Sequence, residues 1–184
     1  YSPLPAVERE ESLMQSICRL DALVNNGFTQ KSLEDKFLEG SYQVVHIASH
    51  GQFRRNLEDT YLLTYDDNFN LNELENMIRP SMFRDSPVEL LTMSACQTAV
   101  GDDRAALGLA GVAIKAGARS ALASLWYVSD EATAELIKQF YDNYVNLNMS
   151  KTRALREAQI NLKADVRFLY DRYWAPYILV GNWL

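Results

Sequence analysis

The amino-acid sequence predicts an α/β domain in which helices flank a mostly parallel sheet on both faces. Two apolar runs, at 42–48 and 88–93, consist of strand-forming residues and end abruptly at small polar residues, which is typical of buried parallel strands. A third run at 120–126 has the same character, and stretches with helical periodicity separate the later strands. Strands that alternate with helices favour a parallel sheet, because parallel neighbours require a long crossover connection.

The remaining elements follow from periodicity and from turn signals. A helix is expected over 6–19, where apolar residues recur at helical spacing and acidic residues lie early in the run. The sequence Asp66-Asp67-Asn68 indicates a hairpin between strands at 60–65 and 69–71. The other expected elements are a short strand at 20–24, a turn at 25–27, helices at 29–38, 72–79, 104–116, 130–145 and 150–163, and a last strand at 174–180. Ser129 and Gly117 are expected to cap helices.

Length, composition and charge describe an ordinary acidic globular domain. The chain has 184 residues, which suits one domain, with 48% hydrophobic and 23% charged residues. Its net charge of −6 and pI near 5.0 argue against nucleic acid or an anionic membrane as the main partner. No apolar run reaches the ~18 residues that a membrane span requires. Two cysteines give no disulfide framework, which favours a reducing, cytoplasmic setting.

His50 and Cys96 both follow the end of a predicted buried strand. In an open α/β sheet, sites lie in the crevice beyond the carboxyl ends of the strands, so the fold can bring these residues together although they are 46 positions apart. A free thiol with a pKa of ~8.5 is only a few per cent thiolate at neutral pH, and a neighbouring imidazole activates it by taking the proton. The pair therefore suggests a nucleophilic cysteine with a histidine base.

Three segments, in this order, resemble the CHAT domain. They are Ala48-Ser49-His50-Gly51, the run 94–102 (Ser-Ala-Cys-Gln-Thr-Ala-Val-Gly-Asp) and the run 123–130 (Ala-Ser-Leu-Trp-Tyr-Val-Ser-Asp). The resemblance runs from about Leu4 to the C-terminus and includes the run 177–181. CHAT domains are grouped with caspases, separases and gingipains among the caspase-fold cysteine proteases, so the resemblance implies a caspase-like fold for the whole chain, 1–184.

The resemblance also implies a function and a context. It implies a cysteine endopeptidase that uses His50 and Cys96 through a thioester acyl-enzyme, with the backbone N–H groups of Gly51 and Cys96 as the oxyanion hole. The expected substrate is a protein or peptide, and neither a metal nor another cofactor is required. The chain begins at Tyr1 without a leader, so we interpret it as part of a longer protein. By resemblance it lacks N-terminal strands, and a helical-repeat region such as TPRs is a candidate regulatory neighbour.

Trp126 and Asp130 follow the third predicted strand and are candidate substrate-binding residues. The run that contains them resembles the separase segment whose acid holds an arginine at the P1 position of the substrate. The resemblance therefore implies that Asp130 favours cleavage after basic residues. The alternative is that Asp130 is an acid in the first turn of a helix, after the cap Ser129, where the helix dipole favours a negative charge.

Two other functions are compatible with parts of the pattern. A non-catalytic interaction or regulatory module would keep the caspase-like fold without using the dyad. A doubly wound nucleotide-binding domain is disfavoured, because Gly101, Gly108 and Gly111 lack phosphate-loop spacing and no Gly-Lys-Ser/Thr follows them.

Several other reactive or aromatic residues are assigned to the structure rather than to the site. His46 lies inside a predicted strand and is read as a core histidine. A zinc site shared with His50 is rejected, because in a strand the two residues lie ~13 Å apart. Cys18 is read as core packing. Asp102 and Asp103 are read as acids at a helix N-terminus, with substrate binding as the alternative. The C-terminal aromatic residues are read as packing for the last strand, with a partner surface as the alternative: Phe168, Tyr170, Tyr173, Trp174, Tyr177 and Trp183.

Overall fold

The computed structural model describes residues 5–52, 60–83, 85–94, 110–111, 113–126 and 128–184. The helices are α1 (Pro5–Ile17), α2 (Gln30–Glu39), α3 (Leu71–Ile78), α5 (Asp130–Tyr141), α6 (Lys151–Ala164) and the single turn α7 (Asp171–Trp174). The strands are β1 (Val44–Ala48), β2 (Gly51–Gln52), β3 (Tyr61–Leu63), β4 (Asn68–Asn70), β5 (Leu90–Ser94), β6 (Ser120–Ser124) and β7 (Tyr177–Gly181). Short 3-10 helices cover Asn25–Gly27 and Arg79–Phe83, and a π-helical turn covers Asp142–Asn146.

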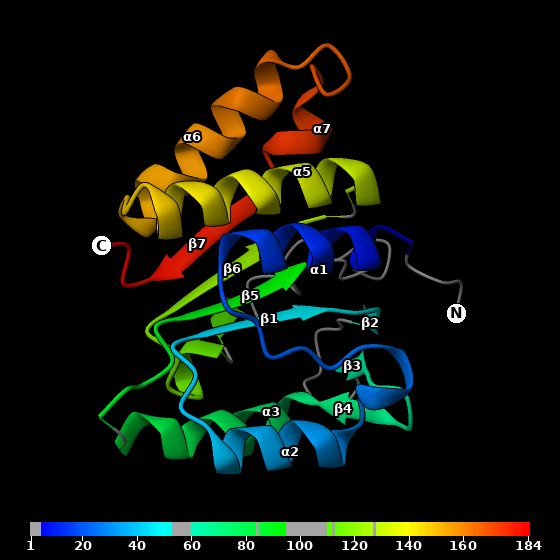
Figure 1. Cartoon of the computed structure of the whole chain (residues 1–184), viewed down its shortest axis with the longest axis vertical. Coiled ribbons are helices and arrows are strands. Elements are labelled where there is room, and N and C mark those ends of the chain that lie inside the picture. The colour runs from blue at the N-terminus through cyan, green and yellow to red at the C-terminus, as the bar shows by residue number, and fades with distance from the viewer. Residues whose placement is uncertain (1–4, 53–59, 84, 95–109, 112, 127) are drawn as a thin grey trace.

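The main sheet has the strand order β1-β5-β6-β7 (Figure 1). Strands β1, β5 and β6 are parallel, with Ala48 paired to Ser94 and Met93 paired to Ala123, whereas β7 runs antiparallel to β6. The predicted α/β class with a mostly parallel sheet is confirmed. Because the three parallel strands are adjacent, their carboxyl ends lie side by side at one edge of the sheet.

Helices cover both faces of this sheet (Figure 1). Successive strand residues point to opposite faces, so even-numbered and odd-numbered positions of β1 and β5 belong to different cores. Leu90 and Leu122 pack with α1, α5 and α6 in one apolar cluster, which also contains Met14 and Phe140. The other cluster joins the opposite face to α2 and α3 and contains Ile47, Leu91, Met93, Leu33, Phe37, Leu74 and Ile78.

A second, three-stranded sheet, β2-β3-β4, continues the chain beyond the end of β1. It contains the predicted hairpin, in which Leu63 pairs with Asn68 and the Thr64 hydroxyl donates a hydrogen bond to the Asp67 carbonyl at 2.7 Å. The same strand β4 leads directly into α3, where Asn70 and Glu73 form a reciprocal capping box. This small sheet therefore holds the segment that follows β1 in a fixed position.

Most predicted bounds are shifted by one or two residues, and three predictions differ more. Residues 20–24 form no strand, and the Asp21 carboxylate instead accepts hydrogen bonds from Lys36 and Tyr42 at 2.9 and 2.7 Å. The last strand begins at Tyr177 rather than at 174, because Asp171–Trp174 forms a helical turn. The helix that begins at Asp130 ends at Tyr141 and continues as the π-helical turn.

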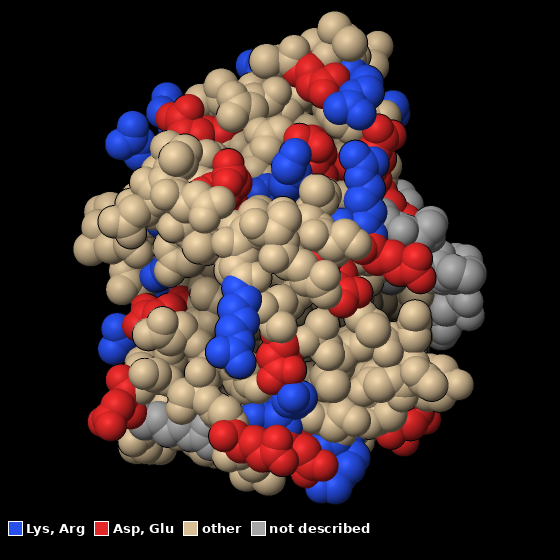
Figure 2. Space-filling view, in the orientation of Figure 1, with Lys and Arg blue, Asp and Glu red and all other residues tan. Residues whose placement is uncertain are grey.

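The surface carries acidic and basic side chains side by side (Figure 2). On the face shown, neither sign of charge forms a continuous area over the described residues. None of the helices in the described part of the chain is long and apolar enough to cross a bilayer.

Candidate active site at the strand ends

The candidate residues follow the carboxyl ends of three neighbouring parallel strands. Ala48 of β1 and Ser94 of β5 are a paired position at the end of the ladder. His50 comes two residues after Ala48, and Cys96 comes two residues after Ser94. Strand β6 ends at Ser124, shortly before Trp126 and Asp130. The strand that leads to the cysteine thus lies between the strand that leads to the histidine and the strand that leads to the tryptophan and aspartate.

His50 is half-buried and lies at the junction of the two sheets, between β1 and β2. Its carbonyl oxygen accepts a hydrogen bond from the Leu63 N–H at 2.8 Å, and the neighbouring Ser49 hydroxyl donates to the Leu63 carbonyl at 2.5 Å. These contacts with β3 hold the backbone of His50 in place.

Gly51 is buried and opens strand β2, where it pairs with Leu62. Since the bond from Leu63 to His50 defines the adjacent hydrogen-bonded pair, Gly51 and Leu62 form a non-hydrogen-bonded pair of the antiparallel ladder. At such a position the N–H points away from the partner strand. The Gly51 N–H is therefore directed away from β3, as an oxyanion donor on this strand would have to be.

Cys96, Asp102 and Asp103 lie outside the described residues, as does the part of the predicted helix from 104 to 109. The described part of that helix, 110–111 and 113–115, is helical, and Gly117 follows it with φ +107°, as expected of a C-cap. The Cys96 assignment as nucleophile therefore stays a prediction.

Trp126 and Asp130 occupy the next strand end. Trp126 is 37% exposed, and its indole N–H donates to the Arg172 carbonyl at 3.3 Å. Asp130 is the first residue of α5, and Ser129 stands at the N-cap position without a hydrogen bond from its side chain to the helix. Asp130 is half-buried.

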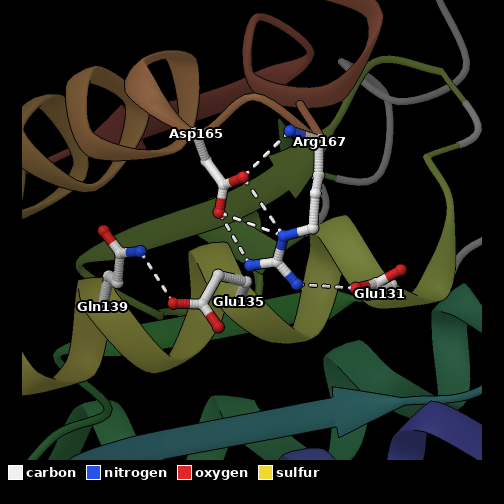
Figure 3. A network of polar contacts seen from close by, with 5 residues as sticks. All are labelled: Glu131, Glu135, Gln139, Asp165 and Arg167. Atoms are coloured by element: carbon white, nitrogen blue, oxygen red, sulfur yellow. Dashed lines mark hydrogen bonds and ion pairs between the residues drawn. The ribbon is translucent and has the colours of Figure 1, made fainter. Parts of the chain in front are cut away.

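Asp130 and its neighbour Glu131 differ in their partners. The Glu131 carboxylate accepts from the Arg167 guanidinium at 2.8 Å, and the same guanidinium also pairs with Asp165 (Figure 3). The Asp165 hydrogen bonds raise the pKa of Arg167, so this cation is permanently charged. In the described part of the chain, the Asp130 carboxylate makes no hydrogen bond or ion pair.

The sheet face beneath α1 holds polar residues that the sequence prediction missed. The His46 Nε2 atom lies 2.8 Å from Glu10 Oε1 and 3.0 Å from Ser94 Oγ, and Nδ1 lies 3.2 Å from the Tyr141 hydroxyl. His46 was predicted to be a satisfied core histidine, and this is confirmed. Glu10 was not singled out, although it lies four residues before Met14 and seven before Ile17 and so shares their helix face.

The described residues contain no group of three or more His, Cys, Asp and Glu side chains that is arranged to hold a metal ion. Cys18 is half-buried just after α1, and burial raises the pKa of its thiol. A raised thiol pKa lowers the thiolate fraction at neutral pH, which makes Cys18 a poor nucleophile.

Comparison with known proteins gives one family. The family model described as "CHAT domain" matches residues 1–182, which is nearly the whole chain. No curated protein matches the chain.

Proposed function

Because the chain belongs to the CHAT family, a family of caspase-like proteases, we propose that it is a cysteine endopeptidase in which His50 and Cys96 form the catalytic dyad. The membership rests on a match to residues 1–182. The observation that carries the catalytic proposal is the pairing of Ala48 with Ser94 on adjacent parallel strands. Each residue precedes a member of the dyad by two positions, so the two strands end side by side at equal distance in sequence from the dyad.

The proposed reaction begins with proton transfer from the Cys96 thiol to the His50 imidazole. The thiolate attacks the carbonyl carbon of the scissile peptide bond, and the carbonyl oxygen becomes an oxyanion. The imidazolium then protonates the leaving amine, so that the C–N bond breaks and a thioester remains. Water, deprotonated by His50, attacks the thioester carbonyl and releases the carboxylic acid and the free thiol.

Oxyanion stabilisation is assigned to the backbone N–H groups of Gly51 and Cys96. The direction of the Gly51 N–H away from β3 supports this assignment, because the group is not used in the β2–β3 ladder. Glycine also lets the substrate carbonyl approach the backbone without meeting a side chain. In subtilisin, removing one oxyanion donor costs roughly 2.7–4 kcal/mol of transition-state stabilisation, which sets the scale expected of such a group.

A peptide library read by mass spectrometry tests the proposal. We expect the wild-type protein and Cys18→Ala to cleave peptides, and we expect Cys96→Ala and His50→Gln to lose cleavage with an unchanged Tm. A thiol-reactive probe, used in parallel, should label Cys96 much faster than Cys18, whose pKa is raised by burial. Cleavage by purified Cys96→Ala would overturn the assignment of the nucleophile.

The competing function is a non-catalytic interaction module with the same fold. It predicts that the wild-type protein cleaves no peptide in the library and that Cys96 reacts with the probe no faster than an ordinary thiol. The regulatory neighbour that we propose, a helical-repeat region, is tested by measuring cleavage in the full-length protein and in the isolated domain.

A further inference from the structure

Five polar side chains are buried together between helix α1, helix α5 and the main sheet. Glu10 and Tyr141 are 4% and 3% exposed, Thr92 and Ser94 are fully buried, and the His46 side chain is 9% exposed. The surrounding face of the sheet is apolar, with Leu90 and Leu122 in the same layer. Burying a carboxylate in such surroundings is unfavourable unless it is paired and hydrogen-bonded, so its presence requires a reason.

The Glu10 carboxylate of α1 contacts residues of two neighbouring strands. Its Oε1 atom lies 2.8 Å from His46 Nε2 on β1 and accepts from the Ser94 hydroxyl on β5 at 3.0 Å. His46 Nε2 also lies 3.0 Å from Ser94 Oγ, so the three groups form a closed triangle. One side chain of α1 therefore ties β1 to β5.

Helix α5 completes the network from the other side of His46. The Tyr141 hydroxyl donates to Thr92 Oγ1 at 2.8 Å, and its oxygen lies 3.2 Å from His46 Nδ1. Thr92 pairs with His46 across β1 and β5. The orientation of the imidazole is thus fixed at both nitrogens, by α1 at Nε2 and by α5 at Nδ1.

The network extends from the middle of β1 and β5 to the end of β5, where the chain leads toward Cys96. Ser94 is the last residue of β5 and stands two positions before Cys96, and His46 stands four positions before His50. A shift in the register of β5 against β1 would change the relative position of the two strand ends. The Glu10 triangle resists that shift directly, because it bonds one side chain from each strand.

We propose that Glu10 is a positioning residue: through His46 and Ser94 it holds the ends of β1 and β5 in the register that brings His50 and Cys96 into reacting geometry. The inference rests on the proposed function. It makes the docking of α1 on the sheet a condition for activity, although α1 supplies no reacting group. A displacement of about 1 Å at reacting atoms lowers the rate by up to about 10²-fold, so loss of Glu10 should be visible in kcat.

A purely structural role predicts a different pattern. A buried pair of hydrogen-bonded polar side chains is weak evidence for stability, and replacing both partners by apolar residues of similar size is often neutral or stabilising. Removing one partner leaves the other buried without compensation and is destabilising. Replacing both Glu10 and His46 by apolar residues therefore distinguishes an effect on stability from an effect on strand positioning.

The experiment compares Glu10→Gln, the double variant Glu10→Leu/His46→Leu, and the exposed-residue control Glu8→Gln from the same helix, all in a Cys18→Ala background. The readouts are kcat and KM on a peptide that the wild-type protein cleaves, Tm, and the alkylation rate of Cys96 by iodoacetamide well below Tm. We expect Glu10→Gln to lower kcat about 10–100-fold with little change in KM, and Glu8→Gln to have no effect. We expect the double variant to regain Tm but not kcat.

Two results would overturn the proposal. One is a kcat that returns to the wild-type value in the double variant together with Tm. The other is a wild-type kcat and Cys96 alkylation rate in folded Glu10→Gln, which decides the matter even where the double variant fails to fold. Failure of the proposed function is distinguishable, because it appears in the wild-type protein as an absence of cleavage and of Cys96 labelling.

Discussion

The Nδ1 atom of His46 lies 3.2 Å from the hydroxyl oxygen of Tyr141, and that hydroxyl donates to Thr92 at 2.8 Å. Burial raises the pKa of Tyr141 well above its ordinary value, so the phenol stays protonated and keeps donating. Tyr141→Phe should therefore lower the free energy of unfolding by about 1–3 kcal/mol, because Thr92 and His46 each lose a buried partner. Urea unfolding measures the change.

The matched control is Tyr144→Phe on the following turn. The Tyr144 ring stacks on Phe140 but its hydroxyl has no partner among the described residues. Its removal should change the unfolding free energy by less than about 0.5 kcal/mol. Equal losses for the two variants would contradict the hydrogen bonds assigned to Tyr141.

Glu75 should make the stability of the domain depend on pH in the acid range. Its carboxylate is paired with Lys115 at 2.9 Å and with Arg79 one helical turn later. The Lys115 hydrogen bond, opposed by burial and aided by Arg79, lowers the pKa of Glu75 below its ordinary value. A lowered native pKa adds stability above the unfolded-state pKa, and this contribution disappears as the pH falls through the native pKa.

We therefore expect the Tm of the wild-type protein to fall more steeply than that of Glu75→Gln between about pH 5 and pH 3. Glu34→Gln, which removes an exposed carboxylate of α2, should leave the wild-type slope intact. Parallel curves for the wild-type protein and Glu75→Gln would exclude the Glu75 pairs as a source of acid sensitivity.

Gly117 and Gly111 should respond in opposite directions to the same substitution. Gly117 has φ +107°, and an added Cβ would collide with the Met82 side chain, so Gly117→Ala forces both backbone and side chain to move. We expect a loss of at least about 1–2 kcal/mol. Gly111 is helical and an added Cβ meets no atom of the described residues within 4 Å, so Gly111→Ala should gain about 0.4–1 kcal/mol. Thermal unfolding decides both signs.

The predicted architecture is confirmed wherever hydrophobic periodicity alone determines an element. Strands β1, β5 and β6, the hairpin at Asp66-Asp67-Asn68 and the main helices lie where the sequence predicts them. The segment 20–24 resembles a strand by composition but pairs with no strand of either sheet, and its Asp21 side chain bonds to Lys36 and Tyr42 instead. Pairing partners are a property of the fold, and no local pattern encodes them.

The residues of the candidate site are likewise predicted only in part by the sequence. His50, Trp126 and Asp130 lie just beyond the ends of parallel strands, a position that a strand-to-loop transition in the sequence indicates. Glu10 could not be paired with His46 from the sequence, since the two are 36 positions apart and meet only through the packing of α1 on the sheet. The signal that was present is a carboxylate on the apolar face of a predicted helix.

The last prediction concerns substrate specificity and rests on Asp130. We expect cleavage after Arg, and more weakly after Lys, because a half-buried carboxylate can bind a guanidinium through two charge-assisted hydrogen bonds but binds an ammonium only as a point charge. Asp130 stands beyond the end of β6, next to the strand end that leads to Cys96, and its carboxylate has no partner in the described part of the chain.

Asp130→Ala should lower kcat/KM for a P1 Arg peptide about 10–100-fold, since a hydrogen bond to a charged group contributes about 1.5–3 kcal/mol. Glu131→Ala is the matched control: it removes the adjacent carboxylate, which is already paired with Arg167, and should leave the P1 preference unchanged. Peptides that differ only at P1 give the comparison. A preference of the wild-type protein for an apolar P1, or an Arg preference that survives Asp130→Ala, would show that Asp130 serves only the N-terminus of α5, and the proposed dyad would be unaffected.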